Sequence, residues 1–395
     1  MGKLDRLIEE LCPDGVEYKS LKEIAVVSGA GVDKKINTNE QPIKLLNYMD
    51  VYRNNYIDSS LDFMEVTASE NKISQCNVLK GDVFITPSSE VLNDIGNAAV
   101  ITEDLENVVY SYHIMRIRLK KRNFITSKYM GYIFESNYVQ TQINRYAEGI
   151  TRYGLTKTKW EGITIPLPPL PVQEEIVRIL DNFTELTAEL TAELTARKQQ
   201  YEYYRDELLT FGDEVEWKTL IECTDISRGI RVVKSQLESN GKYPVYQNSM
   251  EPLGYYDKYN SESNTTFVIV AGAAGEIGYS ETDFWAADDC FYFKCKGYLL
   301  SRFLYYVLYS QQYFIFRKVR KASIPRLPRR DIEKLMIPIP PLDQQERIVS
   351  ILDKFDALVN DISIGLPAEI EARQKQYEYY REKLLTFKEL DEKEA

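Results

Sequence analysis

The residues that could carry out catalysis are few and scattered. His113 is the single histidine, and it lies between Tyr112 and Ile114 in a run that we expect to be a strand, so a core or surface position is favoured over a role as general base. Asp288 and Asp289 could begin a metal site, but no further acids cluster near them in the sequence. The five cysteines show no CxxC spacing, and we expect them to be reduced and structural: Cys12, Cys76, Cys223, Cys290 and Cys295.

The motifs of nucleotide-binding and hydrolytic enzymes are missing as well. The chain has no GxxxxGK[ST] loop and no GxSxG elbow, and the motifs expected of a DNA methyltransferase are not found. The glycine-rich run AGAAGEIGYS (271–280) lacks the lysine and the GxGxxG spacing, so we interpret it as a turn between strands. The sequence therefore favours a binding protein, while an enzyme with an unfamiliar site is kept as an alternative.

Positive charge is concentrated in two segments of an acidic chain. The 395 residues carry a net charge of −11, yet segment 110–160 has ten basic residues opposed only by Glu135 and Glu148, and segment 294–330 has ten basic residues and no acid. One such segment is usually a solvated face. Two in matching positions, with aromatic residues between the charges, indicate nucleic acid as the ligand, with arginines contacting phosphates for affinity and base edges for specificity.

The chain is an internal repeat. PLPPLPVQEEIVRILDNF (166–183) returns as PIPPLDQQERIVSILDKF (338–355), and ARKQQYEYYRDELLTF (196–211) returns as ARQKQYEYYREKLLTF (372–387). The offsets are 172 and 176 residues, so the second copy is four residues longer between its matched ends. Weaker matches join VEYKSL (16–21) to VEWKTL (215–220), which predicts a globular–helix–globular–helix order.

Each repeat ends in a predicted long helix. Paired prolines at 168–169 and 340–341 block a helix from upstream, and an apolar stripe from Ile176 to Leu208 steps by threes and fours. The first helix is expected to be roughly 39 residues long, or about 58 Å. Gly212 follows as a stop. In the second copy, Gly365-Leu366-Pro367 predicts a break or sharp kink. The two stripes are expected to pack as an antiparallel pair, although contact with other chains is an alternative.

The run TAELTAELTA (187–196) inside the first helix is a four-residue unit of about one helical turn. If the helix sets the distance between two globular domains, the run acts as a ruler through Thr187, Leu190, Thr191 and Leu194. The alternative is that TAEL is only a good helix former. Short β-like stretches such as DVFIT (82–86) and TTFVIVAG (265–272), followed by aromatic helices, predict that the globular parts are two α+β domains of related topology.

The sequence resembles the specificity (S) subunit of Type I restriction–modification enzymes over nearly its whole length. The residues that carry the resemblance are IPLPPLPVQEEIVRIL and IPIPPLDQQERIVSIL, the paired QYEYYR…LLTF helix ends, and the two dissimilar domains between them. The resemblance implies an α+β fold with two target recognition domains separated by two long antiparallel coiled-coil helices, as an internal pseudo-two-fold repeat. The expected segments are a first recognition domain (1–166), a central helical spacer (167–211), a second recognition domain (212–338) and a C-terminal helical spacer (339–395).

The resemblance also implies partners and cofactors. Each domain would read one half of a bipartite site in double-stranded DNA, and the helices would dock two modification (M) subunits, with restriction (R) subunits in the full complex. S-adenosylmethionine would be held by the M subunits, and ATP with Mg²⁺ by the R subunits. This chain would bind no cofactor or metal and would have no catalytic residue. The absence of an apolar stretch long enough to span a bilayer predicts no membrane segment, and the charged N-terminal segment predicts a cytoplasmic location.

Position and charge select the candidate DNA-binding residues. In the first domain these are Arg53, Ser88, Ser89, Arg152, Tyr153, Lys157 and Lys159. In the second domain they are Arg228, Arg231, Gln247, Asn248, Lys321, Arg326, Arg329 and Arg330. For each, the alternative is an ordinary surface residue. For the whole chain, the alternative is a coiled-coil scaffold or adaptor that joins proteins without reading DNA, which the paired cationic segments disfavour.

Overall fold

The chain forms two compact units, and each unit contains a part of the first long helix and a part of the second, broken one. The computed structural model describes residues 2–121, 123–238, 240–361 and 364–390. The first unit comprises Met1–Glu189 and Glu371–Ala395, and the second comprises Leu190–Ile370. This division follows packing rather than function, so the four segments expected from the sequence remain a prediction.

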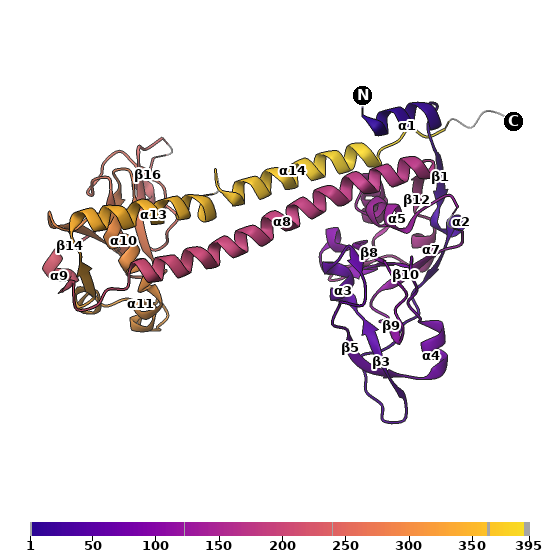
Figure 1. Ribbon diagram of the computed structural model, residues 1–395, viewed down its shortest axis with the longest axis horizontal. Helices are drawn as coiled ribbons and strands as arrows, with labels where there is room; N and C mark the ends of the chain where they lie inside the picture. Colours follow the sequence, from indigo (N-terminus) through magenta and orange to yellow (C-terminus); the bar gives the residue numbers. More distant parts are fainter. Residues whose placement is uncertain (1, 122, 239, 362–363, 391–395) are drawn as a thin grey trace. The chain divides into compact units, whose positions relative to one another are not determined.

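The first unit is an α+β domain joined to helical segments (Figure 1). Its strands are β1 (Glu17–Ser20), β2 (Ala25–Ser28), β3 (Gln41–Leu46), β4 (Tyr56–Ile57), β5 (Met64–Ala68), β6 (Val83–Ile85), β7 (Ser88–Ser89), β8 (Ala98–Ile101), β9 (Val108–Tyr110), β10 (Met115–Leu119), β11 (Tyr153–Gly154) and β12 (Thr164–Leu167). Its helices are α1 (Lys3–Leu11), α2 (Leu21–Ile24), α3 (Tyr48–Arg53), α4 (Glu70–Gln75), the 3₁₀ turn η1 (Leu92–Asp94), α5 (Ser127–Phe134), α6 (Asn137–Tyr146) and α7 (Lys157–Glu161).

The second unit repeats much of this order. Its strands are β13 (Glu216–Thr219), β14 (Thr224–Arg228), β15 (Tyr243–Tyr246), β16 (Tyr255–Tyr256), β17 (Thr265–Ile269), β18 (Ile277–Ser280), β19 (Trp285–Ala286), β20 (Cys290–Cys295) and β21 (Met336–Ile339). Its helices are α9 (Leu220–Cys223), the 3₁₀ turn η2 (Lys234–Gln236), α10 (Ser301–Ser310), α11 (Gln312–Lys318), α12 (Arg329–Glu333) and α13 (Leu342–Asn360). The glycine-rich run joins β17 to β18, as expected.

The two units share one sheet topology, which confirms the α+β fold class and the internal repeat. The strand order β2-β10-β6-β8 in the first unit corresponds to β14-β20-β17-β18 in the second, and both sets are antiparallel throughout. A smaller layer, β5-β3-β9, corresponds to β16-β15-β19 with the same mixture of one antiparallel and one parallel pair. Two-stranded ladders of β1 with β12 and of β13 with β21 lie at the domain ends of the long helices.

The first long helix has the predicted length. α8 (Leu170–Leu208) is 39 residues long and begins directly after Pro168-Pro169. The second copy is broken, as expected, because α13 ends at Asn360 and α14 (Leu366–Leu385) begins at the Leu366-Pro367 pair. Proline fits the first turn of α14 since the missing N–H has no helical acceptor there.

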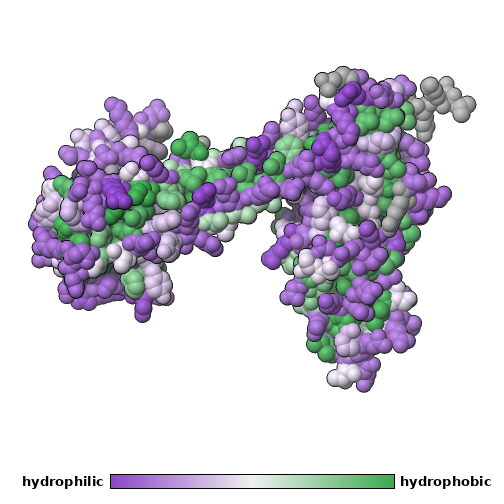
Figure 2. Space-filling view, in the orientation of Figure 1, coloured by the Kyte–Doolittle hydropathy of each residue, from purple (hydrophilic) through white to green (hydrophobic). Residues whose placement is uncertain are grey.

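Aromatic contacts between the long helices repeat in both units. In the first unit Phe183 of α8 stacks on Tyr380 of α14, with ring centroids 5.6 Å apart. In the second unit Phe355 of α13 stacks on Tyr204 of α8 at 5.7 Å. The helices are therefore antiparallel, as expected, and Figure 2 shows hydrophobic residues along them between hydrophilic ones.

A buried glutamine near the start of each long helix forms hydrogen bonds with the domain that precedes the helix. The side-chain oxygen of Gln173 accepts from the backbone N–H of Thr126 at 2.9 Å, and its amide donates to the carbonyls of Phe124 (2.8 Å) and Pro168 (2.7 Å). The amide of Gln345, 172 residues later, makes the equivalent three bonds, with Leu300, Tyr298 and Pro340. Both glutamines are fully buried, so each unmade bond would cost the desolvation of a backbone group.

An aspartate two turns further along each helix binds the aromatic helix of its domain. Asp181 accepts from Tyr132 at 2.6 Å and from Lys128 at 2.9 Å. Asp353 likewise accepts from Tyr306 and from Arg302, the latter at 2.7 Å. Position and direction of each long helix are thus set by polar contacts that recur in both repeats.

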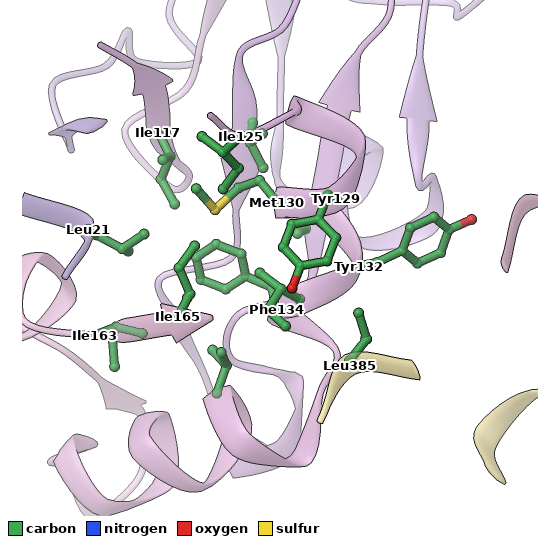
Figure 3. Packing of buried hydrophobic residues seen from close by; sticks show 14 of the residues in the cluster. Leu21, Ile117, Ile125, Tyr129, Met130, Tyr132, Phe134, Ile163, Ile165 and Leu385 are labelled. Carbon is green, nitrogen blue, oxygen red and sulfur yellow. The ribbon is translucent and has the colours of Figure 1, made fainter. Parts of the chain in front are cut away.

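The segment that follows residue 370 completes the first unit. Leu385 of α14 packs in the core with residues such as Tyr129 and Ile165 (Figure 3). The Tyr18 hydroxyl donates to the carbonyl of Phe387 at 2.9 Å, and the Leu390 N–H donates to the carbonyl of Val16 at 3.0 Å. The first domain therefore depends on residues that lie more than 300 positions away in the sequence.

The ion pair between Lys3 of α1 and Glu175 of α8 predicts that the stability of the fold depends on pH. Hydrogen bonds from Arg178 and Lys3 lower the pKa of Glu175 from its ordinary value of 4.5 to about 2, although burial opposes this shift. A lowered folded-state pKa stabilises the fold above 4.5 and loses that contribution as the pH falls toward 2. We expect Glu175→Gln to lower the melting temperature at pH 7 and the difference to shrink between pH 4.5 and pH 3. Thermal unfolding of both proteins across this range checks it, and a difference independent of pH would contradict it.

Candidate nucleic-acid interface

Part of each cationic segment is used by the fold and is not available to a ligand. Arg116 is buried and donates to the carbonyl of Asn77, and Arg118 makes a two-pronged ion pair with the buried Asp82, at 2.6 Å for each prong. Lys128 and Arg302 are the partners of the helix aspartates described above. Arg122 lies outside the described residues. Arg116, Arg118, Lys128 and Arg302 each have an internal acceptor, and none of them is among the predicted DNA-binding residues.

Four predicted residues of the first domain lie together. Ser88 and Ser89 form β7, which pairs antiparallel with Gly154 and Tyr153 of β11. The Arg152 Nε donates to the Ser88 Oγ at 3.1 Å, which holds the guanidinium beside this small ladder. The cluster borders a surface cavity of about 440 Å³, whose other walls come from α3, the η1 loop and the turn at residue 113.

The three remaining predicted residues of the first domain do not line this cavity. Lys157 and Lys159 lie on α7 and are ion-paired with Glu161 (3.5 Å) and Glu148 (2.6 Å). Arg53 is the last residue of α3 and is exposed, but it does not line the cavity to which that helix contributes Tyr48, Met49 and Tyr52. No observation tests these residues for binding, so they stay predictions.

His113 lies in a turn and not in a strand, contrary to the expectation. Segment 111–114 connects β9 to β10 and places the imidazole at the same cavity as Arg152. Burial lowers the pKa of His113, and the charges of Lys34 and Arg152 lower it further. A neutral imidazole can donate or accept a hydrogen bond at the cavity wall.

The second domain gathers arginines around a cavity of about 340 Å³. Arg228 and Arg326, both predicted, line it together with Arg320. Apolar residues such as Phe291 and Leu327 form part of the wall, and Asp289 adds one carboxylate. Among the described residues, no carboxylate lies within ion-pair distance of the three guanidinium groups. Such an arrangement can bind a phosphate or the acceptor edge of a guanine.

The other predicted residues of the second domain do not line this cavity, and they differ in their contacts and exposure. Arg329 packs over the Phe291 ring and pairs with Glu333 at 2.7 Å, whereas Arg330 is exposed. Asn248 accepts from the Ala273 N–H through its backbone carbonyl and lies beside the loop that follows β17. The exposed Arg231 and Lys321 and the half-buried Gln247 are not among the cavity residues.

Sequence reasoning missed several residues at these cavities, including Tyr48, Tyr52 and Arg320. Arg320 lies in the cationic segment already identified, but its spacing from Arg326 does not indicate that the two residues pair. The tyrosines of α3 gave no such signal because aromatic residues are abundant along the whole chain.

Within the described residues, no three His, Cys, Asp or Glu side chains gather in a way that could hold a metal ion. The five cysteines are free, and four of them are buried. No helix of the described segments has the length and apolarity required to cross a bilayer.

Comparison with known proteins assigns the class of this fold. The model of the Type I restriction modification DNA specificity domain matches residues 13–197 and again residues 212–372, so the chain belongs to this family. A type I restriction enzyme specificity subunit of Haemophilus influenzae is 38% identical over 275 residues, which cover 61% of this chain and 68% of that protein. The EcoR124I/EcoR124II specificity subunit of Escherichia coli is 36% identical over 282 residues, covering 63% and 69%.

Solved structures show the same fold. The S subunit of a Type I restriction–modification system from M. genitalium aligns with a TM-score of 0.61 at 15% identity, over 94% of this chain and 96% of that one. A chain from a study of complex assembly in the type I R-M system aligns with a TM-score of 0.58 at 18% identity, over 95% and 98%.

Two arginines of the first domain should behave differently when replaced. Arg118→Gln leaves the buried Asp82 without its charge partner, so we expect a loss of about 3 kcal/mol in the free energy of unfolding. Arg152→Gln changes an exposed side chain and should alter stability by less than about 0.5 kcal/mol, while it weakens DNA binding. Urea unfolding and DNA titration of both variants measure this. Equal losses of stability would contradict the assignment.

Proposed function

We propose that this chain is the DNA sequence-specificity subunit of a Type I restriction–modification complex and that its two domains recognise the two halves of a bipartite target in double-stranded DNA. The observation that carries the proposal is the duplicated scaffold, in which each copy of one topology presents different side chains at a surface cavity, with one arginine in the first copy and three in the second. Family membership supports the same conclusion. Two unlike readers on a common scaffold suit a target with two unlike halves.

The partners proposed for the chain are two modification (M) subunits and, in the full complex, restriction (R) subunits. The chain itself is non-catalytic and binds no cofactor in this proposal. S-adenosylmethionine belongs to the M subunits, and ATP with Mg²⁺ to the R subunits. The repeated YEYYR segments support docking on the long helices, because Tyr203 and Tyr379 are exposed at equivalent positions of the two copies, and exposed tyrosine is typical of protein interfaces.

A direct test uses the chain assembled with its modification subunit. We expect sequence-selective binding in a gel-shift assay, with an affinity that falls steeply as salt rises because phosphate contacts release counterions. Arg326→Gln should reduce the negative slope of log affinity against log salt by about 1 if this arginine contacts a phosphate. A complex that forms but binds every DNA sequence equally, or none, would instead support the adaptor reading.

The length of α8 should set the unread gap between the half-sites. The described residues 181–200 of α8 are all half-buried or exposed, so this part of the helix tolerates a change of length better than its ends. Deleting Thr187–Leu190 removes about 6 Å of helix and about 40° beyond a full turn. At about 3.4 Å for each base pair, we expect the gap to shorten by one or two base pairs while the bases read on either side stay the same.

Mapping of methylated sites checks this expectation. The matched control replaces Thr187 and Thr191 by alanine without changing the helix length, and it should leave the gap unchanged. Altered half-sites with an unaltered gap after the deletion would show that the TAEL run is only a helix former.

A further inference from the structure

Two surface hairpins, one in each unit, are built in the same way. In the first unit the backbone groups of Glu148 and Gly154 exchange two hydrogen bonds of 3.0 Å. In the second unit Arg320 and Arg326 exchange bonds of 2.8 and 3.2 Å. Each pair encloses five residues, and the two pairs are 172 residues apart, which is the offset of the repeat. We call segments 148–154 and 320–326 the reading hairpins.

Each reading hairpin is anchored to its own domain at the same place. Gly154 pairs with Ser88 in the segment that follows β6, and Arg326 forms the equivalent bridge to Ala271 in the segment that follows β17. A second bond, from the Gly272 N–H to the Pro325 carbonyl at 3.2 Å, adds to the anchor in the second unit. The bases of the hairpins are therefore held by backbone bonds that do not depend on the side chains at the tips.

The tips differ in sequence and are exposed. The enclosed residues are GITRY in the first hairpin and KASIP in the second, and the first four residues of each are exposed. Each tip presents an isoleucine to solvent: Ile150 is 93% exposed and Ile324 is 54% exposed. The flanking helices α7 and α12 and strands β12 and β21, in contrast, follow one pattern. A common scaffold with different tips is what two readers of different sequences require.

The second tip has basic surroundings, whereas the first tip carries one arginine and borders a cavity that Glu90 and Asp94 also line. Arg152 stands two residues after Ile150, and Lys321 and Arg326 flank Ile324. Within the described residues no carboxylate is within ion-pair distance of Arg152, Lys321 or Arg326. Each hairpin also borders a cavity of its unit. The first hairpin does so through Arg152, and the second does so through Arg320, Ala322, Ile324 and Arg326. The three arginines at the second hairpin, and an Arg152 without a carboxylate partner among the described residues at the first, favour a polyanion as the occupant over an acidic protein surface.

We propose that the two reading hairpins are the base-reading elements, one for each half-site, with isoleucine making apolar contact to a base edge and the neighbouring arginine hydrogen-bonding to guanine. This inference rests on the proposed function and assigns its specificity to named residues. In the major groove a thymine methyl group offers the apolar contact and the guanine O6 and N7 accept from arginine. Ile150 acts in one half-site and Ile324 in the other.

The test compares methylation motifs of the assembled complex with its modification subunits. The variants are Ile150→Ser and Ile324→Ser, and the matched controls are Ile36→Ser and Ile221→Ser, which change exposed isoleucines of the same units outside the hairpins. Each hairpin variant should relax base preference at one or two positions of a single half-site by about tenfold, and the two variants should affect opposite halves. The controls should keep the parental motif.

Other results would overturn the assignment. An unchanged motif in both hairpin variants, or a uniform loss of affinity for every sequence, would show that the hairpins do not read bases. Weaker assembly on size-exclusion chromatography, with an unchanged motif written by the complex that still forms, would show that the hairpins dock a protein. Failure of the proposed function itself is distinguishable, because the unmodified chain would then confer no motif at all.

Discussion

The buried amide at the start of each long helix is the contact on which the rest of the architecture depends. Gln173 and Gln345 bond to backbone groups of their own domain and to the proline segment that precedes the helix, so they connect the two directly. Backbone partners make the contact insensitive to which side chains the domain carries elsewhere. The domain surface can therefore vary in sequence while the direction in which its helix leaves is retained, since Asp181 and Asp353 add a second point of attachment two turns later.

In this arrangement the core elements are alike in the two units, whereas the surface residues differ. The matched sheets, the aromatic helices α5 and α10 and the ladders at the helix ends bury most of the apolar side chains. Additions such as α3 and α4 occur in the first unit, and the described residues of the second unit form no helix between β15 and β17. Chemistry at the surface is correspondingly different: serines, tyrosines and one arginine surround the first cavity, whereas three arginines surround the second.

Local signals made most of the fold predictable from the sequence, whereas the site was predictable only in part. Paired prolines, a stripe of apolar residues and Gly365-Leu366-Pro367 act over a few residues, so the bounds of α8 and the break before α14 could be read directly. Whether a basic side chain forms an internal ion pair or stays available to a ligand depends on which acid lies near it in the folded chain. Arg118 and Arg302 meet Asp82 and Asp353 from distant segments, which no spacing rule reveals. His113 was misplaced because apolar neighbours in a tight turn resemble those of a strand.

The dependence of the first unit on α14 and Phe387 has a consequence for biosynthesis. A ribosome makes residues 1–189 well before Glu371–Leu390, so the emerging first domain lacks Leu385 in its core and the partner of the Val16 carbonyl. The second unit, by contrast, is assembled from the contiguous stretch 190–370. The second unit can therefore complete its fold before the first unit, although most of the first unit is translated earlier. A nonsense mutation near codon 370 would remove residues that the first, N-terminal unit needs.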